Sequence, residues 1–151
     1  MKIERKVVLR ASPGAVFELV DDLGQYPQWM DLVHDVREVD GPDGNLRSWD
    51  VELRAQVGPL ARSKRLTMVR TIHEPTERVV FERSEVDGRR HSSWVLESAL
   101  VQQASGEVEL TMTLTYGGNL WTGAVLERVL DDHVERGARS LTELLESPEH
   151  E

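Results

Sequence analysis

The feature that most constrains this chain is an alternation of apolar and polar residues, which is typical of a β-strand with one buried face. It is clearest at residues 46–57, where Trp49, Val51 and Leu53 alternate with polar or charged side chains. Turn sequences rich in Gly, Pro and Asp separate such segments. The predicted strands cover residues 2–10, 33–40, 46–57, 63–73, 78–85, 89–102 and 107–116. Short connections of this kind favour a seven-stranded antiparallel sheet.

Helices are predicted between the first two strands and at the end of the chain. Ser12 and Pro13 suit the N-cap and the first turn of a short helix, which Gly24 is expected to end. A second short helix is expected over residues 25–30. Apolar residues recur at helical spacing over residues 119–146, which predicts one long amphipathic helix.

Together these elements predict an α+β fold in which a strongly curved sheet wraps around the long C-terminal helix. A sheet with one apolar face needs a cover, and this helix is the only long amphipathic segment of the sequence. One helix is only about 10 Å wide, so a cavity is expected between it and the curved sheet. Residues 1–147 are predicted to form a single domain and residues 148–151 a frayed tail.

Charge and composition argue against several classes of function. The 151 residues include 18 Lys and Arg against 27 Asp and Glu, a net charge of −9 that disfavours nucleic-acid binding. Cysteine is absent and the five histidines show no metal-ligand spacing, so neither a metal nor a cofactor is expected. No apolar run reaches the ~18 residues of a membrane span, and the N-terminus does not resemble a signal peptide. We therefore expect a cytoplasmic protein, with a homodimer left open.

Several local motifs support a family resemblance that spans the chain. They are the segment Ala11-Ser12-Pro13-Gly14-Ala15-Val16-Phe17, residues 21–23, the Tyr26-Pro27-x-Trp29 turn and the closing helix. With these motifs the chain resembles the START/Bet v 1-like (SRPBCC) superfamily, in its polyketide cyclase/dehydrase and lipid-transport branch. The resemblance implies a helix-grip fold whose cavity, between the sheet and the C-terminal helix, holds an apolar small molecule. The superfamily includes both carriers and enzymes, so function has to be argued from the cavity.

The inward faces of the predicted elements are rich in aromatic and aliphatic residues, which are typical of a small-molecule pocket. The predicted ligand-binding residues are Tyr26, Trp29, Trp49, Val51, Leu53, Met68, Arg70, Phe81, Trp94, Leu96, Met112, Tyr116, Leu126, Leu130 and His133. The same stripes are also what a simple packed core would show. For Tyr26 and Trp29, two interpretations have equal weight: they gate the entrance, or they pin the short helices to the sheet. The first hypothesis for the function is that the protein binds or carries a lipid, polyketide or isoprenoid.

Arg70 is the most informative single residue. It lies on the apolar face of its strand, and a guanidinium cannot lose its charge, so it needs a carboxylate, a carbonyl-bearing ligand or solvent. A shift in register that points Arg70 outward remains the alternative. In aromatase/cyclases of the superfamily an arginine on the corresponding strand is thought to polarise the polyketide carbonyl, and the resemblance implies this role for Arg70. Met68 and Val33, however, stand where those enzymes have hydroxyl side chains.

The second hypothesis is therefore a polyketide aromatase/cyclase- or dehydrase-like enzyme, in which Tyr116 or His133 moves protons beside Arg70. His133 lies on the inward line of the long helix, where a hydrogen-bonded core histidine is the alternative. A third hypothesis is a non-enzymatic protein-interaction module that acts through an exposed patch.

Overall fold

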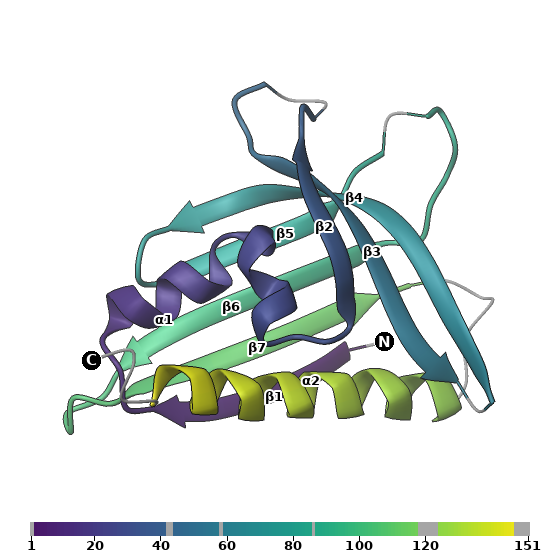
Figure 1. The fold of residues 1–151 in the computed structure, drawn as a ribbon. Helices are drawn as coiled ribbons and strands as arrows, with labels where there is room; N and C mark the ends of the chain where they lie inside the picture. Colours follow the sequence, from purple (N-terminus) through teal and green to yellow (C-terminus); the bar gives the residue numbers. More distant parts are fainter. Residues whose placement is uncertain (1, 42–43, 58, 86, 118–123, 147–151) are drawn as a thin grey trace.

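The computed structural model describes residues 2–41, 44–57, 59–85, 87–117 and 124–146, and it has seven strands and three helices in that part of the chain (Figure 1). The strands are β1 (Lys2–Leu9), β2 (Val33–Val39), β3 (Ser48–Val57), β4 (Leu60–Glu74), β5 (Arg78–Arg83), β6 (Trp94–Gln102) and β7 (Val108–Tyr116). The helices are α1 (Pro13–Val20), the 3₁₀-helix η1 (Leu23–Gln28) and α2 (Ala124–Leu145).

The strands form one sheet in the order β1-β7-β6-β5-β4-β3-β2, and each described pairing is antiparallel. The strands β2 to β6 each pair with the next strand along the chain. The β1–β7 pair is different, because it joins the first strand to the last. The sheet curves over α2, which runs beside β1, and α1 and η1 lie between the first two strands (Figure 1). The predicted helix-grip architecture is therefore confirmed.

Local sequence explains the short helices. Ser12 caps α1, since its Oγ accepts a hydrogen bond from the Ala15 amide at 3.1 Å, and Pro13 opens the helix as expected. The prediction that Gly24 ends this helix is wrong. The helix ends at Val20, and Gly24 lies inside η1, where its amide donates to Asp22 Oδ1 at 2.8 Å. An aspartate N-cap thus starts η1 earlier than the predicted residues 25–30.

Strand boundaries differ most before β6, which starts at Trp94 and not at residue 89. The preceding residues form a loop around the Asp87 carboxylate, which accepts hydrogen bonds from the Arg89 amide at 2.9 Å and from His91 Nε2 at 2.8 Å. These hydrogen bonds hold the residues before Trp94 in a loop, so they do not pair with a neighbouring strand as a longer β6 would. Residues 119–123 of the predicted long helix, and the predicted tail, lie outside the described residues.

The core lies between the sheet and the helices. The buried side chains of α2 follow its inward stripe, at Leu130, His133, Val134, Ala138, Leu141 and Leu145. This spacing of three and four residues is the amphipathic pattern that the sequence predicted. None of the helices among the described residues has both the length and the apolar character that crossing a bilayer requires.

Candidate ligand-binding site

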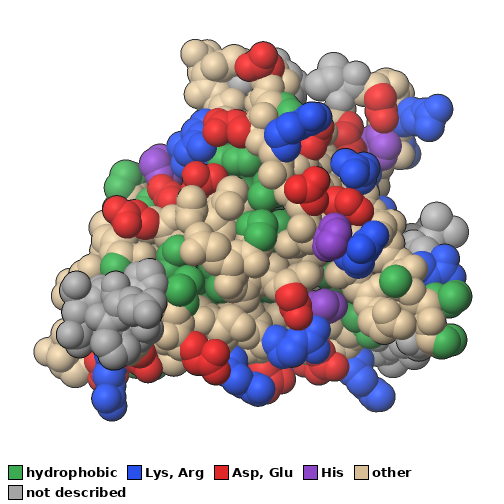
Figure 2. All heavy atoms as spheres, in the orientation of Figure 1, with side chains coloured by type: hydrophobic (Ala, Val, Ile, Leu, Met, Phe, Trp, Pro, Cys, Tyr) green, Lys and Arg blue, Asp and Glu red, His purple; other side chains and the backbone are tan. Residues whose placement is uncertain are grey.

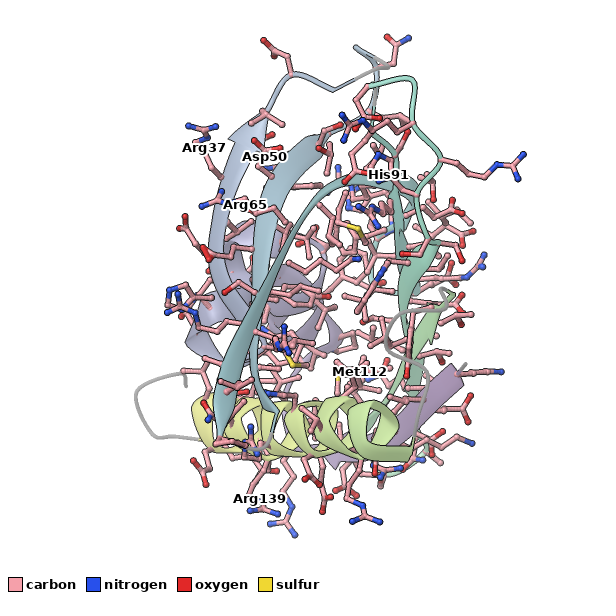
Figure 3. The ribbon with its side chains drawn as sticks, turned by 90° about the vertical axis from the view of Figure 1, so that its right-hand side faces the viewer. Arg37, Asp50, Arg65, His91, Met112 and Arg139 are labelled. Carbon is pink, nitrogen blue, oxygen red and sulfur yellow. The ribbon has the colours of Figure 1, made fainter. Side chains whose placement is uncertain are left out.

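The inward surface of the sheet, which we call the concave face, is fixed by strand register, because residues paired across strands share a face. It includes Trp49, Val51 and Leu53 of β3; Lys64, Leu66, Met68 and Arg70 of β4; Val79, Phe81 and Arg83 of β5; Trp94, Leu96, Ser98 and Leu100 of β6; and Val108, Leu110, Met112, Leu114 and Tyr116 of β7. Every predicted ligand-binding residue of the strands therefore belongs to this surface. In Figure 3 Met112 points into the space above α2, whereas Arg37 and Arg139 point away from it.

Four aromatic residues fill one part of this surface, and we call them the aromatic cluster: Tyr26, Trp29, Trp49 and Phe81. Phe81 meets the ring of Trp49 edge-on at a centroid distance of 5.4 Å and that of Tyr26 at 6.1 Å. The rings of Tyr26 and Trp29 lie 4.6 Å apart. All four side chains are buried, and such ring contacts add to the free energy of burial. This part of the concave face is packed as a core.

Three of the predicted ligand-binding side chains cap the C-terminal end of α1, where backbone carbonyls lack helical partners. The Tyr26 hydroxyl donates to the Val20 carbonyl at 2.9 Å, and Trp29 Nε1 donates to the Leu19 carbonyl at 3.0 Å. Burial raises the pKa of the Tyr26 hydroxyl, which keeps this donor protonated. These contacts favour the interpretation that Tyr26 and Trp29 pin the short helices to the sheet. Their contact with a ligand stays a prediction.

Arg70 completes this cap. Its Nη1 donates to the Asp21 carbonyl at 3.0 Å, so a main-chain carbonyl provides the partner that the sequence required. Burial and the nearby Arg47 charge lower the pKa of the guanidinium, while Asp21, Asp22 and Glu38 act in the opposite direction. Arg70 therefore faces the junction of α1 with η1, where it has an evident structural task. Its catalytic role stays a prediction.

His133 joins α2 to the segment that follows η1. Its Nδ1 lies 2.5 Å from Asp31 Oδ1 and 3.0 Å from Arg136 Nη2, and the ring is buried as its position on the helix predicted. Burial alone would raise the pKa of the Asp31 carboxyl, but the hydrogen bond from His133 and the charges of His133 and Arg136 outweigh it and lower that pKa. Arg70 and His133 thus have different partners, Asp21 for one and Asp31 for the other.

We expect Asp31→Asn to lower the free energy of unfolding near neutral pH by about 1 kcal/mol or less, as for other partly exposed ion pairs. A carboxyl whose pKa is lowered on folding stabilises the protein above its unfolded pKa of ~3.9, and this contribution is lost as the pH falls through the folded value. Denaturant unfolding of both proteins over a pH series measures the difference, which should be largest near neutrality and vanish in strong acid. Asp132→Asn, at an exposed neighbour, is the control. A difference that persists unchanged in acid would contradict the expectation.

Several side chains of the concave face near the β5–β6 loop and along the β3–β4 hairpin keep some exposure, and we call them the loop-end surface: Leu53, Trp94, Leu96, Leu114 and Tyr116. Trp94 and Tyr116 stack with ring centroids 5.3 Å apart and retain 8% and 7% exposure, against 0% for Phe81. Leu96 is half-buried. Figure 3 views the molecule from this side. Leu130 of α2 is buried opposite the sheet, and the side chain of Leu126 lies outside the described residues.

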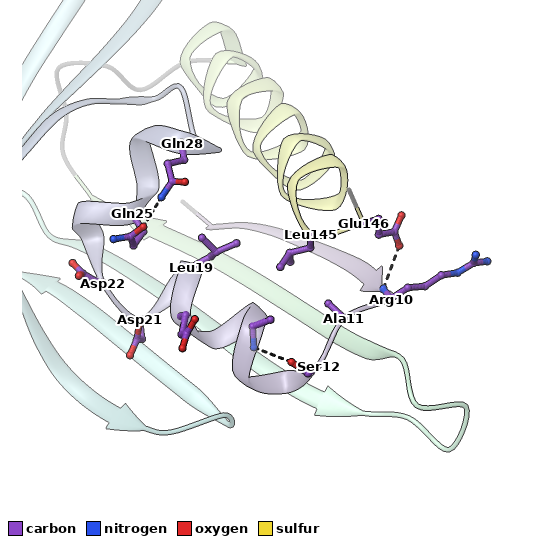
Figure 4. A pocket seen from close by; sticks show the side chains of 12 residues that line it. Arg10, Ala11, Ser12, Leu19, Asp21, Asp22, Gln25, Gln28, Leu145 and Glu146 are labelled. Atoms are coloured by element: carbon purple, nitrogen blue, oxygen red, sulfur yellow. Dashed lines mark hydrogen bonds between the residues drawn. The ribbon is translucent and has the colours of Figure 1, made fainter. Parts of the chain in front are cut away.

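A separate groove of about 1050 Å³ lies between α1, η1 and the end of α2 (Figure 4). Ala11, Ala15 and Leu19 line it together with several acidic side chains. Two of the acids already have partners, since Asp22 Oδ1 accepts from the Gly24 amide and Glu146 Oε1 from the Arg10 amide at 3.2 Å. This groove is distinct from the concave face and is not the cavity that the sequence predicts.

Sequence reasoning missed the charged residues at the loop end, Lys64, Arg83 and Glu85. The signal was present for Lys64, because strict alternation places it on the same face as Leu66. The described residues hold no group of three His, Cys, Asp or Glu side chains that could bind a metal ion.

The outer surface is mixed in character. Figure 2 shows acidic and basic side chains interspersed over one face, with apolar ones in small separate patches. The large apolar side chains exposed among the described residues are Val8, Leu46, Leu60 and Val101.

A curved antiparallel sheet closed over one C-terminal helix, with an apolar concave face, defines the helix-grip class of START-like proteins. Comparison with known proteins agrees with this class. A START superfamily protein from Mycobacterium smegmatis is 16% identical, with a TM-score of 0.74 over 96% of this chain and 97% of that one. The Zhui aromatase/cyclase from Streptomyces sp. R1128 is 14% identical, with a TM-score of 0.72 over 97% and 93% of the two chains. The protein TTHA0849 from Thermus thermophilus is 15% identical, with a TM-score of 0.73 over 96% and 97%.

At these identities the structural matches establish the fold. The family follows from sequence, because the profile described as "Polyketide cyclase / dehydrase and lipid transport" matches residues 1–146. The chain belongs to this family, within the SRPBCC superfamily. A search of curated proteins gave no significant match.

Proposed function

We propose that the protein binds or carries a hydrophobic small molecule of lipid, polyketide or isoprenoid type against the loop-end surface, between the sheet and α2. The observation that carries this proposal is the incomplete burial of Leu96, an inward-facing leucine between Phe81 and Leu114. The aromatic cluster is closed, whereas Trp94, Tyr116 and Leu53 retain 7–9% exposure and Leu96 is half-buried. Apolar side chains that are neither packed shut nor on the outer surface are the kind that line a ligand pocket.

The composition of this surface supports binding more than catalysis. Two stacked aromatic rings and three leucines offer a broad apolar contact with few groups that could move a proton. The enzyme alternative needs Arg70, Tyr116 and His133 around one substrate. Arg70 donates to the Asp21 carbonyl, and His133 contacts Asp31 at 2.5 Å, so both groups would have to leave existing partners to react.

Filling the loop-end surface should block binding. We expect Leu96→Trp to weaken the binding of 1-dodecanol by about tenfold or more, which corresponds to ~1.4 kcal/mol, because the larger ring occupies the space beside Phe81 and Leu114. The matched control is Val95→Trp, since Val95 is also half-buried in β6 but points to the opposite face. Titration calorimetry measures both affinities, and thermal unfolding reports whether each variant is folded.

Native mass spectrometry of the protein as purified from cells gives a second readout, for which we expect an apolar molecule to be retained. Unchanged dodecanol binding in Leu96→Trp would place the ligand elsewhere. Absence of both a retained molecule and dodecanol binding in the unaltered protein would refute the proposal.

A further inference from the structure

Lys64 is a cation on an otherwise apolar part of the concave face. Its strand partner is the buried Leu53, and the next residue of β4 on the same face is the buried Leu66. Lys64 is half-buried, and its ammonium forms no hydrogen bond or ion pair with any residue that the structure describes. Burial lowers the pKa of this ammonium, and the Arg83 charge lowers it further, while Glu85 acts in the opposite direction. Lys64 therefore faces Arg83 and Glu85 across the loop end.

Arg83, in contrast, is completely engaged. Its side chain is 7% exposed, and its Nε donates to Glu85 Oε2 at 2.7 Å. Its Nη1 donates to both the carbonyl and the hydroxyl of Ser92 at 3.2 Å, and its Nη2 lies 3.2 Å from His91 Nδ1. Because a guanidinium only donates, His91 Nδ1 accepts, and His91 Nε2 carries the proton that bonds Asp87 at 2.8 Å.

Among the charged side chains described at this end, Lys64 is a half-buried cation without a bonded partner. Glu85 is paired with Arg83, and the Asp87 carboxylate is bound by His91 Nε2 and the Arg89 amide on the exposed loop. Lys64 has no such partner among the described residues. A half-buried cation without a partner is costly, and an anion that binds there recovers that cost. One unmatched charge suits a carboxylate better than a phosphate monoester, which brings about two negative charges near neutral pH.

We propose that Lys64 binds the carboxylate of an amphiphilic ligand whose apolar chain lies along the loop-end surface. This inference rests on the proposed function and narrows the ligand class to acids such as fatty acids or polyketide acids. Trp94 and Tyr116 lie at the same end, because Trp94 follows directly on the loop that Arg83 holds through Ser92. The head group and the first part of the chain would thus meet a cation and an aromatic stack together. Arg83 positions the loop and Glu85 but contributes no free charge.

The test compares two probes of equal chain length, dodecanoate and 1-dodecanol, by titration calorimetry near neutral pH. The unaltered protein should bind dodecanoate at least about tenfold more tightly than dodecanol. Lys64→Met, which keeps a side chain of similar length, should abolish this preference and leave dodecanol binding unchanged. Lys64→Arg should retain the preference. Lys6→Met removes an exposed lysine from the outer face of β1 and should behave as the unaltered protein does.

The outcomes separate the two proposals. Equal affinity for both probes in the unaltered protein, or a preference that survives Lys64→Met, overturns the role of Lys64 and leaves the proposed function standing. Failure of both probes to bind the unaltered protein overturns both. Thermal unfolding of each variant shows whether it is folded, so that loss of the preference for dodecanoate can be told apart from loss of the fold.

Discussion

Phe81→Ala is expected to lower the free energy of unfolding by about 3–5 kcal/mol, a large share of the roughly 5–15 kcal/mol that holds a domain of this size together. The side chain of Phe81 is completely buried, and its ring meets those of Trp49 and Tyr26. Removing the ring forfeits its burial and leaves a cavity that Trp49 and Tyr26 cannot close, because Tyr26 is tied to the Val20 carbonyl. Denaturant unfolding measures the loss.

Leu96→Ala is the matched control, since Leu96 pairs with Phe81 across β5 and β6 and shares its face. Leu96 is half-buried on the loop-end surface, so its removal should cost only about 1 kcal/mol. A small loss for Phe81→Ala, comparable to that for Leu96→Ala, would mean that the aromatic cluster also borders an open space. The two variants therefore locate the boundary between packed core and ligand site.

Most of the fold could be predicted because the signals were local. Alternation at residues 46–57 fixed both a strand and its buried face, and Ser12 with Pro13 fixed the start of α1. The errors arose where a side chain competed with the backbone. Asp22 and Asp87 accept main-chain hydrogen bonds, which start η1 early and delay β6, and such local competition is not visible in apolar periodicity.

The candidate site could be predicted only in part, because alternation gives a face but not what covers it. Arg70 was expected to need a partner, and it has one, but no sequence pattern indicates that this is the Asp21 carbonyl 49 residues away. Helix α1 has Asp21 and not a glycine at its C-cap, so its last carbonyls need donors from other segments. Those donors are Tyr26, Trp29 and Arg70. Side chains that the sequence assigned to a ligand pocket therefore stabilise the fold.

The segment that follows η1 packs on α2 at Gly137, which has no side chain. An added Cβ there would lie 2.6 Å from Met30 Cε, 2.9 Å from Met30 Sδ and 3.5 Å from the Trp29 carbonyl oxygen. The Trp29 carbonyl oxygen is at an ordinary contact distance, so a side chain at position 137 has to displace the buried end of the Met30 side chain. One helical turn before Gly137, His133 binds Asp31, and this bond also holds the segment after η1 against α2.

Gly137→Leu should therefore lower the free energy of unfolding by about 1–3 kcal/mol, even though leucine is the better helix former. Arg139→Leu places the same side chain on the exposed side of α2 and should change stability little, because Arg139 points outward (Figure 3). Met30→Ala combined with Gly137→Leu should cost less than the two single changes added together, since the shorter side chain makes room for the leucine. A simple sum of the two single effects, measured by denaturant unfolding, would show that Met30 is not what the leucine displaces. A stabilised Gly137→Leu would show that the end of the Met30 side chain moves aside at little cost.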